Sequence, residues 1–199
     1  MEASRDHVPS PGNAHNPPGS DVPAMRMPHL DFVYRIIADM DANGISEIPG
    51  VDGTSVARVV LPIQGGTVCG PRIQGVIVER SGADWAQVVD PKKTLWRLNA
   101  NYTLRTDDGV FILVQATGVF RPGPGVSNDV TDKQTVSQDD VEYFTSIRFE
   151  APGGSPYGWM NGIVAIGVMA MWEGKPVIDC YRLTNFPGKL ALSNYIREE

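Results

Sequence analysis

Hydrogen-bonding side chains occupy every second position of residues 96–105. They are Arg97, Asn99, Asn101, Thr103 and Arg105, and the positions between them carry Trp96, Leu98, Ala100, Tyr102 and Leu104. Because a β-strand points successive side chains to opposite faces, this segment would have one polar and one apolar face. In a closed barrel the polar face could line a cavity, where the amides of Asn99 and Asn101 could orient a carbonyl or a phenol. On a solvent-facing strand the same side chains would only be hydrated.

The positions of the histidines exclude several kinds of active site from the folded region. The chain has three, His7, His15 and His29, and all of them precede or open that region. A Ser–His–Asp or Cys–His site therefore cannot form in the core, and neither can a zinc or iron site that uses histidine. Acid–base chemistry would depend on Asp, Glu, Tyr, Lys, Arg or bound water.

Carboxylates and one tyrosine are the candidate acid–base groups. Asp84, in the sequence Gly-Ala-Asp-Trp, is either a general base or a turn carboxylate that accepts backbone N–H groups. Glu150 shares a strand face with Arg148, and the two form either a buried pair facing a substrate or an exterior pair. Tyr181 shares a face with Asp179, and a tyrosine beside a carboxylate can exchange a proton, although such pairs also occur on surfaces.

Aromatic and amide side chains are the candidate ligand contacts. Trp159 and Asn161 share a side by alternation and could clamp a ligand at a barrel mouth. Alternatively, Trp159 is a core residue and Asn161 satisfies loop backbone. Trp85 could stack on a ligand or cover a barrel end. Three polar residues could extend the lining of a cavity: Gln64, Arg72 and Gln74.

Short strand-like segments separated by turn signals make up the folded region. They cover residues 30–40, 55–64, 67–79, 96–105, 110–120, 142–150, 161–172 and 177–184. Asp108-Gly109 predicts a hairpin turn, because both residue types tolerate positive φ. Residues 81–85 are expected to form a corner, residues 121–141 a long polar loop and residues 190–197 a short closing helix. Many short strands without interleaved helices predict an all-β fold, and glycines inside strands favour a single antiparallel barrel.

The composition sets the domain organisation and excludes some partners. Residues 1–28 are rich in Pro, Gly and Ser and are expected to form a disordered tail, which leaves residues 29–199 as the barrel domain. The net charge of −6, without a basic stripe, argues against nucleic acid. No apolar segment is long enough to cross a membrane, and no secretory signal is visible. Cys69 and Cys180 are expected to be buried thiols in a reducing cytosol, which predicts a cytoplasmic location. No nucleotide-binding loop or cofactor motif occurs.

Several motifs, in a fixed order, resemble one known family. They include residues 30–36 (LDFVYRI), 62–71 (PIQGGTVCGP), 82–85 (GADW), 102–109 (YTLRTDDG) and 157–161 (YGWMN). Together they span about residues 30–183, and the sequence resembles the family named domain of unknown function 3237. The resemblance implies a single antiparallel, lipocalin-like β-barrel with a central cavity, and it implies no agreed reaction.

The sequence departs from this family at one place. Before Tyr102 the family typically has Asp-Ala-Arg, whereas this chain has Asn99-Ala100-Asn101. The family's charged pair favours an inward orientation of this strand face. We therefore expect Asn99 and Asn101 in the cavity, and their neutral amides indicate an uncharged ligand.

These features predict a cofactor-independent isomerase or cyclase of secondary metabolite biosynthesis. Its substrate would be an apolar, oxygenated, polyketide- or terpenoid-derived intermediate held in one conformation by the cavity. Asn99, Asn101, Trp159 and Asn161 would orient the substrate, and Asp84, Glu150 or Tyr181 would move a proton. One alternative is a non-catalytic carrier or sensor of a small hydrophobic ligand. Another is an interaction module that forms a homodimer through residues 163–172.

Overall fold

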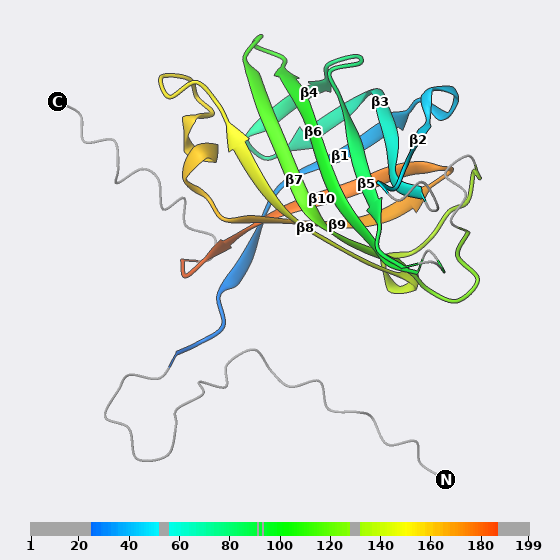
Figure 1. The fold of residues 1–199 in the computed structure, drawn as a ribbon. Helices are drawn as coiled ribbons and strands as arrows, with labels where there is room; N and C mark the ends of the chain where they lie inside the picture. The colour runs from blue at the N-terminus through cyan, green and yellow to red at the C-terminus, as the bar shows by residue number, and fades with distance from the viewer. Residues whose placement is uncertain (1–24, 52–55, 91, 93, 128–131, 187–199) are drawn as a thin grey trace, which may run out of the picture.

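A computed structural model describes residues 25–51, 56–90, 92, 94–127 and 132–186. Within these residues ten strands form one antiparallel sheet that closes on itself (Figure 1). The strands are β1 (His29–Met40), β2 (Ser46–Pro49), β3 (Val56–Gly70), β4 (Ile73–Ile77), β5 (Gly82–Val88), β6 (Trp96–Thr106), β7 (Phe111–Pro122), β8 (Val141–Glu150), β9 (Ala165–Trp172) and β10 (Lys175–Thr184). The connections include the short 3-10 helices η1 (Ala42–Gly44), η2 (Gln138–Asp140) and η3 (Gly158–Gly162).

The sheet closes because β1 has a partner on each side. It pairs with β10 along one edge and with β3 along the other. The order around the barrel is β1, β10, β9, β8, β7, β6, then β4 and β5 in succession, then β3. Since β4 and β5 share one position, the barrel has eight strand positions. A barrel of this size has an interior wide enough for packed side chains or one small ligand.

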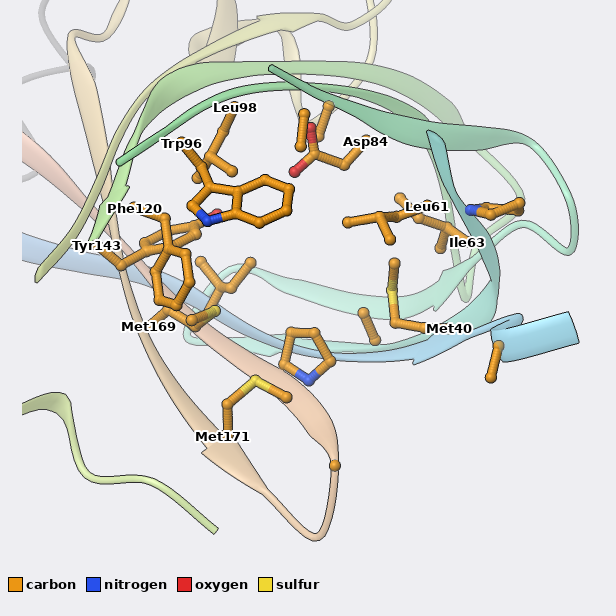
Figure 2. A pocket seen from close by; sticks show the side chains of 18 of the residues that line it. Met40, Leu61, Ile63, Asp84, Trp96, Leu98, Phe120, Tyr143, Met169 and Met171 are labelled. Atoms are coloured by element: carbon orange, nitrogen blue, oxygen red, sulfur yellow. The ribbon is translucent and has the colours of Figure 1, made fainter. Parts of the chain in front are cut away.

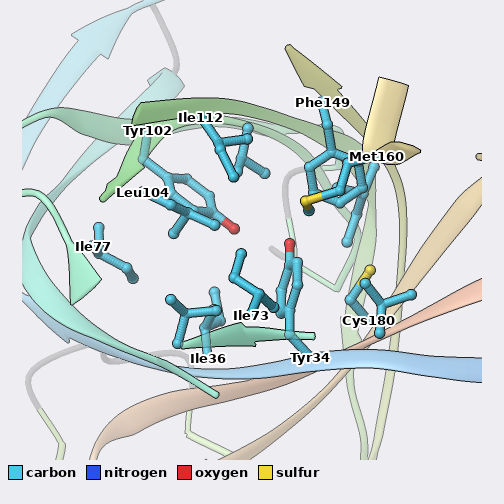
Figure 3. Packing of buried hydrophobic residues seen from close by; sticks show 14 of the residues in the cluster. Tyr34, Ile36, Ile73, Ile77, Tyr102, Leu104, Ile112, Phe149, Met160 and Cys180 are labelled. Carbon is cyan, nitrogen blue, oxygen red and sulfur yellow. The ribbon is translucent and has the colours of Figure 1, made fainter. Parts of the chain in front are cut away.

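One half of the interior is filled by hydrophobic side chains. Tyr34, Ile36, Ile73, Leu104 and Ile112 all have exposed fractions below 2 %, and Figure 3 shows them meeting at the centre of the barrel. They come from β1, β4, β6 and β7, at positions where strand alternation points the side chain inward. Burial of such side chains is the main stabilising contribution in a barrel without helices. This packed half closes one end of the interior.

The Asp108-Gly109 hairpin turn between β6 and β7 is confirmed. Gly109 has a φ of +88°, and the backbone N–H of Gly109 donates to the carbonyl of Thr106. The side chain of Asp108 accepts from the hydroxyl groups of Thr106 and Tyr157. The turn is therefore attached to the segment that leads into η3.

The long loop between β7 and β8 packs against the β9–β10 turn. Val136 forms a β-bridge with Met171, and the backbone N–H of Gly174 donates to the carbonyl of Gln134. The Gln134 side chain bonds the backbone of Ser127 through both its oxygen and its nitrogen. These contacts hold the described part of the loop beside the β9–β10 turn, at one end of the barrel (Figure 1).

The predicted all-β barrel is confirmed, and three local predictions are wrong. Residues 82–88 form strand β5 rather than a corner, because they bridge β3 and β6. Residues 158–162 form η3, so β9 begins at Ala165 rather than near residue 161. The prediction of two buried thiols holds for Cys180, whereas Cys69 is exposed because its β3 neighbours Val68 and Gly70 take the inward positions. The expected closing helix over residues 190–197, and residues 1–24 of the expected tail, lie outside the described residues.

Candidate functional site

A cavity of about 180 Å³ occupies the half of the barrel beneath the long loop. Its walls come from β1 and from β3 to β10, and most of its lining side chains are apolar (Figure 2). The β6 contribution is Trp96, Leu98, Ala100 and Tyr102. The apolar face of β6 therefore points inward, and the expected inward orientation of its polar face is wrong.

Asn99 and Asn101 consequently lie on the outer surface of the barrel. Asn99 is exposed and Asn101 is partly exposed, and the Asn101 amide donates to Oδ1 of Asn99 at 3.2 Å. The physical reason is desolvation: burying amides without matched partners costs free energy, whereas burying the alternate apolar face gains it. The amides at these two positions therefore belong to the exterior and not to the cavity wall.

Asp84 is the predicted acid–base residue that does line the cavity. It lies on β5 between Leu61 of β3 and Ala100 of β6, and Figure 2 shows its carboxyl group pointing inward. Its Oδ1 accepts the backbone N–H of Asn99 at 2.9 Å. Burial in this apolar wall raises the pKa of Asp84 to about 6, although the hydrogen bond from Asn99 acts in the opposite direction.

Two tyrosines bring further polar atoms to the cavity. Tyr143 of β8 and Tyr102 of β6 both line it. Burial raises the pKa of Tyr143, and the nearby carboxyl of Asp84 raises it further. Burial also raises the pKa of Tyr102. Both phenols are therefore neutral hydrogen-bond donors at physiological pH.

Aromatic and sulfur-containing side chains surround the outer part of the cavity. Trp96, Phe120 and Tyr143 are consecutive cross-strand partners on β6, β7 and β8, and all three point inward. Met169 and Met171 come from the adjacent strand β9, and Met169 lies beside Tyr143 (Figure 2). Ser127, Asp132 and Gln134 of the long loop complete the rim. A planar apolar molecule would meet aromatic faces and adaptable thioethers here.

The other predicted acid–base residues point away from the cavity. Glu150 and Arg148 are exposed on the outer face of β8, because Ile147 and Phe149 take the inward positions. Tyr181 lies on the outer face of β10, where its hydroxyl is 3.5 Å from Oδ2 of Asp179. That carboxylate is paired with Arg35 at 2.6 Å. These residues form exterior pairs, which is the second of the alternatives considered for each.

Trp159 and Asn161 lie near the packed end of the barrel, outside the cavity lining. The guanidinium of Arg72 stacks over the Trp159 ring at 4.3 Å, so the structure brings together two of the predicted contact residues, but away from the cavity. The Asn161 side chain bonds both the N–H and the carbonyl of Ala151 at 2.8 Å. Its observed role is thus to satisfy loop backbone.

The three remaining candidates also lie outside the cavity lining. Gln64 falls at the irregularity in β3 where the register with β1 shifts, between Ile63, which lines the cavity, and the buried Gly65. Gln74 is exposed, and its amide donates to the carbonyl of Gly70 at 3.1 Å. Trp85 follows Asp84 on β5 and therefore faces outward. Its carbonyl accepts from Arg58 at 3.4 Å.

Sequence reasoning missed the residues that make up most of the cavity wall. Trp96 and Tyr102 belong to the face that the prediction turned outward, so their position follows once the apolar face is taken as the inner one. Tyr143 had no such signal, because a tyrosine alternating with Glu142 and Phe144 suits either face. Among the described residues, no three His, Cys, Asp or Glu side chains lie together in a way that could hold a metal ion.

The fold and the site define a class: a small antiparallel β-barrel with a mostly apolar internal cavity. Residues 28–183 match the family described as protein of unknown function (DUF3237), and the chain belongs to this family. It is 31% identical over 154 residues to UPF0311 protein RPA1785 of Rhodopseudomonas palustris, covering 76% of this chain and 94% of that protein. No helix among the described residues is long and apolar enough to cross a membrane.

Solved structures share the barrel. The crystal structure of RPA1785 superposes with a TM-score of 0.64 at 27% identity, covering 78% of this chain and 98% of that one. A β-barrel-like protein from Acinetobacter baumannii gives a TM-score of 0.62 at 26% identity, covering 85% and 99%. An enzyme from Penicillium herquei gives 0.56 at 16% identity, covering 80% and 96%, a likeness of fold alone.

Proposed function

We propose that this protein binds a small apolar, oxygenated molecule in the barrel cavity and isomerises or cyclises it without a cofactor. The substrate class is a polyketide- or terpenoid-derived intermediate. The observation that carries the proposal is the placement of one interior carboxyl group, that of Asp84, in a mostly apolar wall. The other two carboxylates of the lining differ, because Asp132 is exposed at the rim and Asp41 accepts the backbone N–H groups of η1.

The environment of Asp84 suits it to proton transfer. Because its pKa is about 6, both its neutral and its ionised form are populated near neutral pH. The carboxylate can accept a proton from one atom of the substrate and return it to another atom of the same molecule. Such a transfer is balanced without an oxidant or a reductant. The pKa of Tyr143 is raised by burial and by the nearby carboxyl of Asp84, so its phenol keeps its proton. It can donate a hydrogen bond to the substrate oxygen that gains negative charge.

The cavity supplies the second part of the mechanism, which is confinement. A flexible molecule enclosed by Trp96, Phe120 and Met169 would be restricted to few conformers. Holding a reactive conformer can lower a barrier by several kcal/mol. The same apolar lining would also suit a carrier or a sensor, so the two functions differ in whether Asp84 acts on the ligand.

A deuterium-exchange assay with 2-tetralone, an apolar cyclic ketone with acidic α-protons, tests the proposal. We expect the full-length protein in D2O to accelerate deuterium incorporation above the buffer rate, as measured by mass spectrometry. Asp84→Asn would abolish this acceleration and leave binding intact, whereas the control variant Glu150→Gln on the outer face of β8 would retain it. Stoichiometric binding with exchange no faster than in buffer would instead establish a carrier.

A further inference from the structure

The hydroxyl group of Tyr34 is a buried polar atom near the cavity. The side chain is fully buried, with an exposed fraction of 0%, and its hydroxyl makes no hydrogen bond within the described residues. A buried hydroxyl without a partner is costly, so its retention requires an explanation. Tyr34 is not itself part of the cavity lining, and it lies behind the wall that Tyr102 forms.

Tyr102 connects this buried hydroxyl to the cavity. It belongs both to the cavity lining and to the packed core, with an exposed fraction of 4%. Figure 3 shows the hydroxyl groups of Tyr34 and Tyr102 pointing toward each other. The labelled side chains around them are apolar and include the sulfur-containing Cys180 and Met160 (Figure 3). The two hydroxyl groups therefore lie where the mostly apolar cavity meets the packed core.

The two hydroxyl groups face each other, but no hydrogen bond joins them. Each phenol has one O–H to donate and an oxygen that can accept. When Tyr102 turns its O–H toward the cavity, its oxygen can accept the O–H of Tyr34. That arrangement gives the buried hydroxyl of Tyr34 the partner that it lacks.

We propose that the Tyr102 hydroxyl is an anchor that donates a hydrogen bond to an acceptor oxygen at the deep end of the ligand, and that Tyr34 is the positioning residue that orients it. The ligand class is an apolar ring system with a carbonyl or ether oxygen at its inner end. The inference rests on the proposed function only in taking the cavity as the ligand site. It does not depend on proton transfer by Asp84.

The proposal narrows the substrate class further. Asp84 and Tyr143 would contact one polar group of the ligand from the side of the cavity, and Tyr102 would contact another from its inner end. A molecule that satisfies both would carry two separated oxygen functions joined by an apolar skeleton. A hydrocarbon of the same size would leave the phenols without an acceptor and would bind more weakly.

A matched pair of probes tests the anchor: 2-tetralone, which has a carbonyl acceptor, and tetralin, which has the same skeleton without oxygen. Dissociation constants for both are measured by calorimetry on the full-length protein. We expect Tyr102→Phe to weaken 2-tetralone binding about tenfold and tetralin binding less than twofold. Tyr34→Phe should weaken 2-tetralone binding about threefold, again without affecting tetralin. Tyr181→Phe, on the outer face, should change neither.

Equal changes for the two probes in Tyr102→Phe, or no change, would overturn the proposal, since a purely structural role affects both alike. If that variant does not fold, the infrared carbonyl stretch of 2-tetralone bound to the wild type tests whether the ligand carbonyl accepts a hydrogen bond. A shift to lower frequency supports the anchor, and a stretch at its hydrocarbon-solvent position refutes it. If Tyr102→Phe selectively loses 2-tetralone affinity but no Asp84-dependent deuterium exchange occurs, the anchoring role of Tyr102 is supported and the enzymatic function is refuted. If the exchange occurs but Tyr102→Phe binds both probes like the wild type, the enzymatic function is supported and the anchoring role is refuted.

Discussion

The carboxylate of Asp84 accepts the backbone N–H of Asn99 at 2.9 Å, while the Asn99 side chain points out of the barrel. The pairing of β5 with β6 includes Asp84 with Ala100 and Gln87 with Arg97, and the two residue pairs between these are absent from the ladder. The Asp84 side chain therefore provides an acceptor where the ladder is interrupted. The carboxyl group that faces the cavity therefore also connects β5 to β6 through this hydrogen bond.

The position of Asp84 predicts a pH-dependent stability. The folded pKa of about 6 is above the ordinary value of 3.8, so the folded protein binds the proton more tightly than the unfolded chain. The contribution of Asp84 is then most favourable below pH 3.8 and is lost as the pH rises through 6. Two pKa units correspond to about 3 kcal/mol, which is an upper limit.

Asp84→Asn should remove the loss of stability at high pH, because the amide group is uncharged and its oxygen can still accept the Asn99 N–H. We expect the variant to be more stable than the wild type by up to about 3 kcal/mol at pH 8, with the difference shrinking toward pH 4. Urea unfolding at several pH values measures it. Parallel stability profiles for the two proteins between pH 4 and 8 would contradict the assigned environment.

The outward position of the two asparagines predicts that they are dispensable. Asn99→Ala and Asn101→Ala should each change the free energy of unfolding by no more than about 0.5 kcal/mol, as is usual for surface sites. Both variants should bind 2-tetralone as the wild type does. A large loss of binding, with the thermal unfolding temperature unchanged, would show that this face contacts the ligand after all.

The short side chain of Ala100 is expected to keep the cavity open. Ala100→Leu would place three more carbon atoms into the space beside Asp84 and should weaken 2-tetralone binding by about tenfold or more. Thr117→Leu is the matched control, because Thr117 pairs with Asn99 on the outer face of the sheet. Isothermal titration of both variants tests this. Unchanged affinity in Ala100→Leu would place the ligand elsewhere.

Asn161 is expected to matter for stability and not for binding. Asn161→Ala would remove both hydrogen bonds to Ala151, whose backbone is buried, and should cost about 2 kcal/mol of unfolding free energy. The affinity for 2-tetralone should remain that of the wild type, since the residue is not part of the cavity. Denaturant unfolding and calorimetry on the same preparation separate the two effects.

Much of the fold could be predicted because strand signals are local. The alternation in residues 96–105, the Asp108-Gly109 turn and the valine-rich segments each depend on neighbours within a few residues. Strand β5 was harder, since its seven residues contain a glycine and are a strand because β3 and β6 lie on either side of them. Helix η3 likewise forms within a loop that Asn161 closes on Ala151 and that Tyr157 attaches to the distant Asp108.

The sequence by itself determined that Asn99 and Asn101 share one strand face and that Trp96, Leu98, Ala100 and Tyr102 share the other. It also placed Asp84 in a region without histidine, where acid–base chemistry depends on other side chains or on bound water. Only the tertiary structure decided which face is the inner one, because that depends on how the sheet closes. A closed barrel of eight strand positions excludes water from much of its interior, so the apolar face lines the cavity and the amides remain hydrated outside.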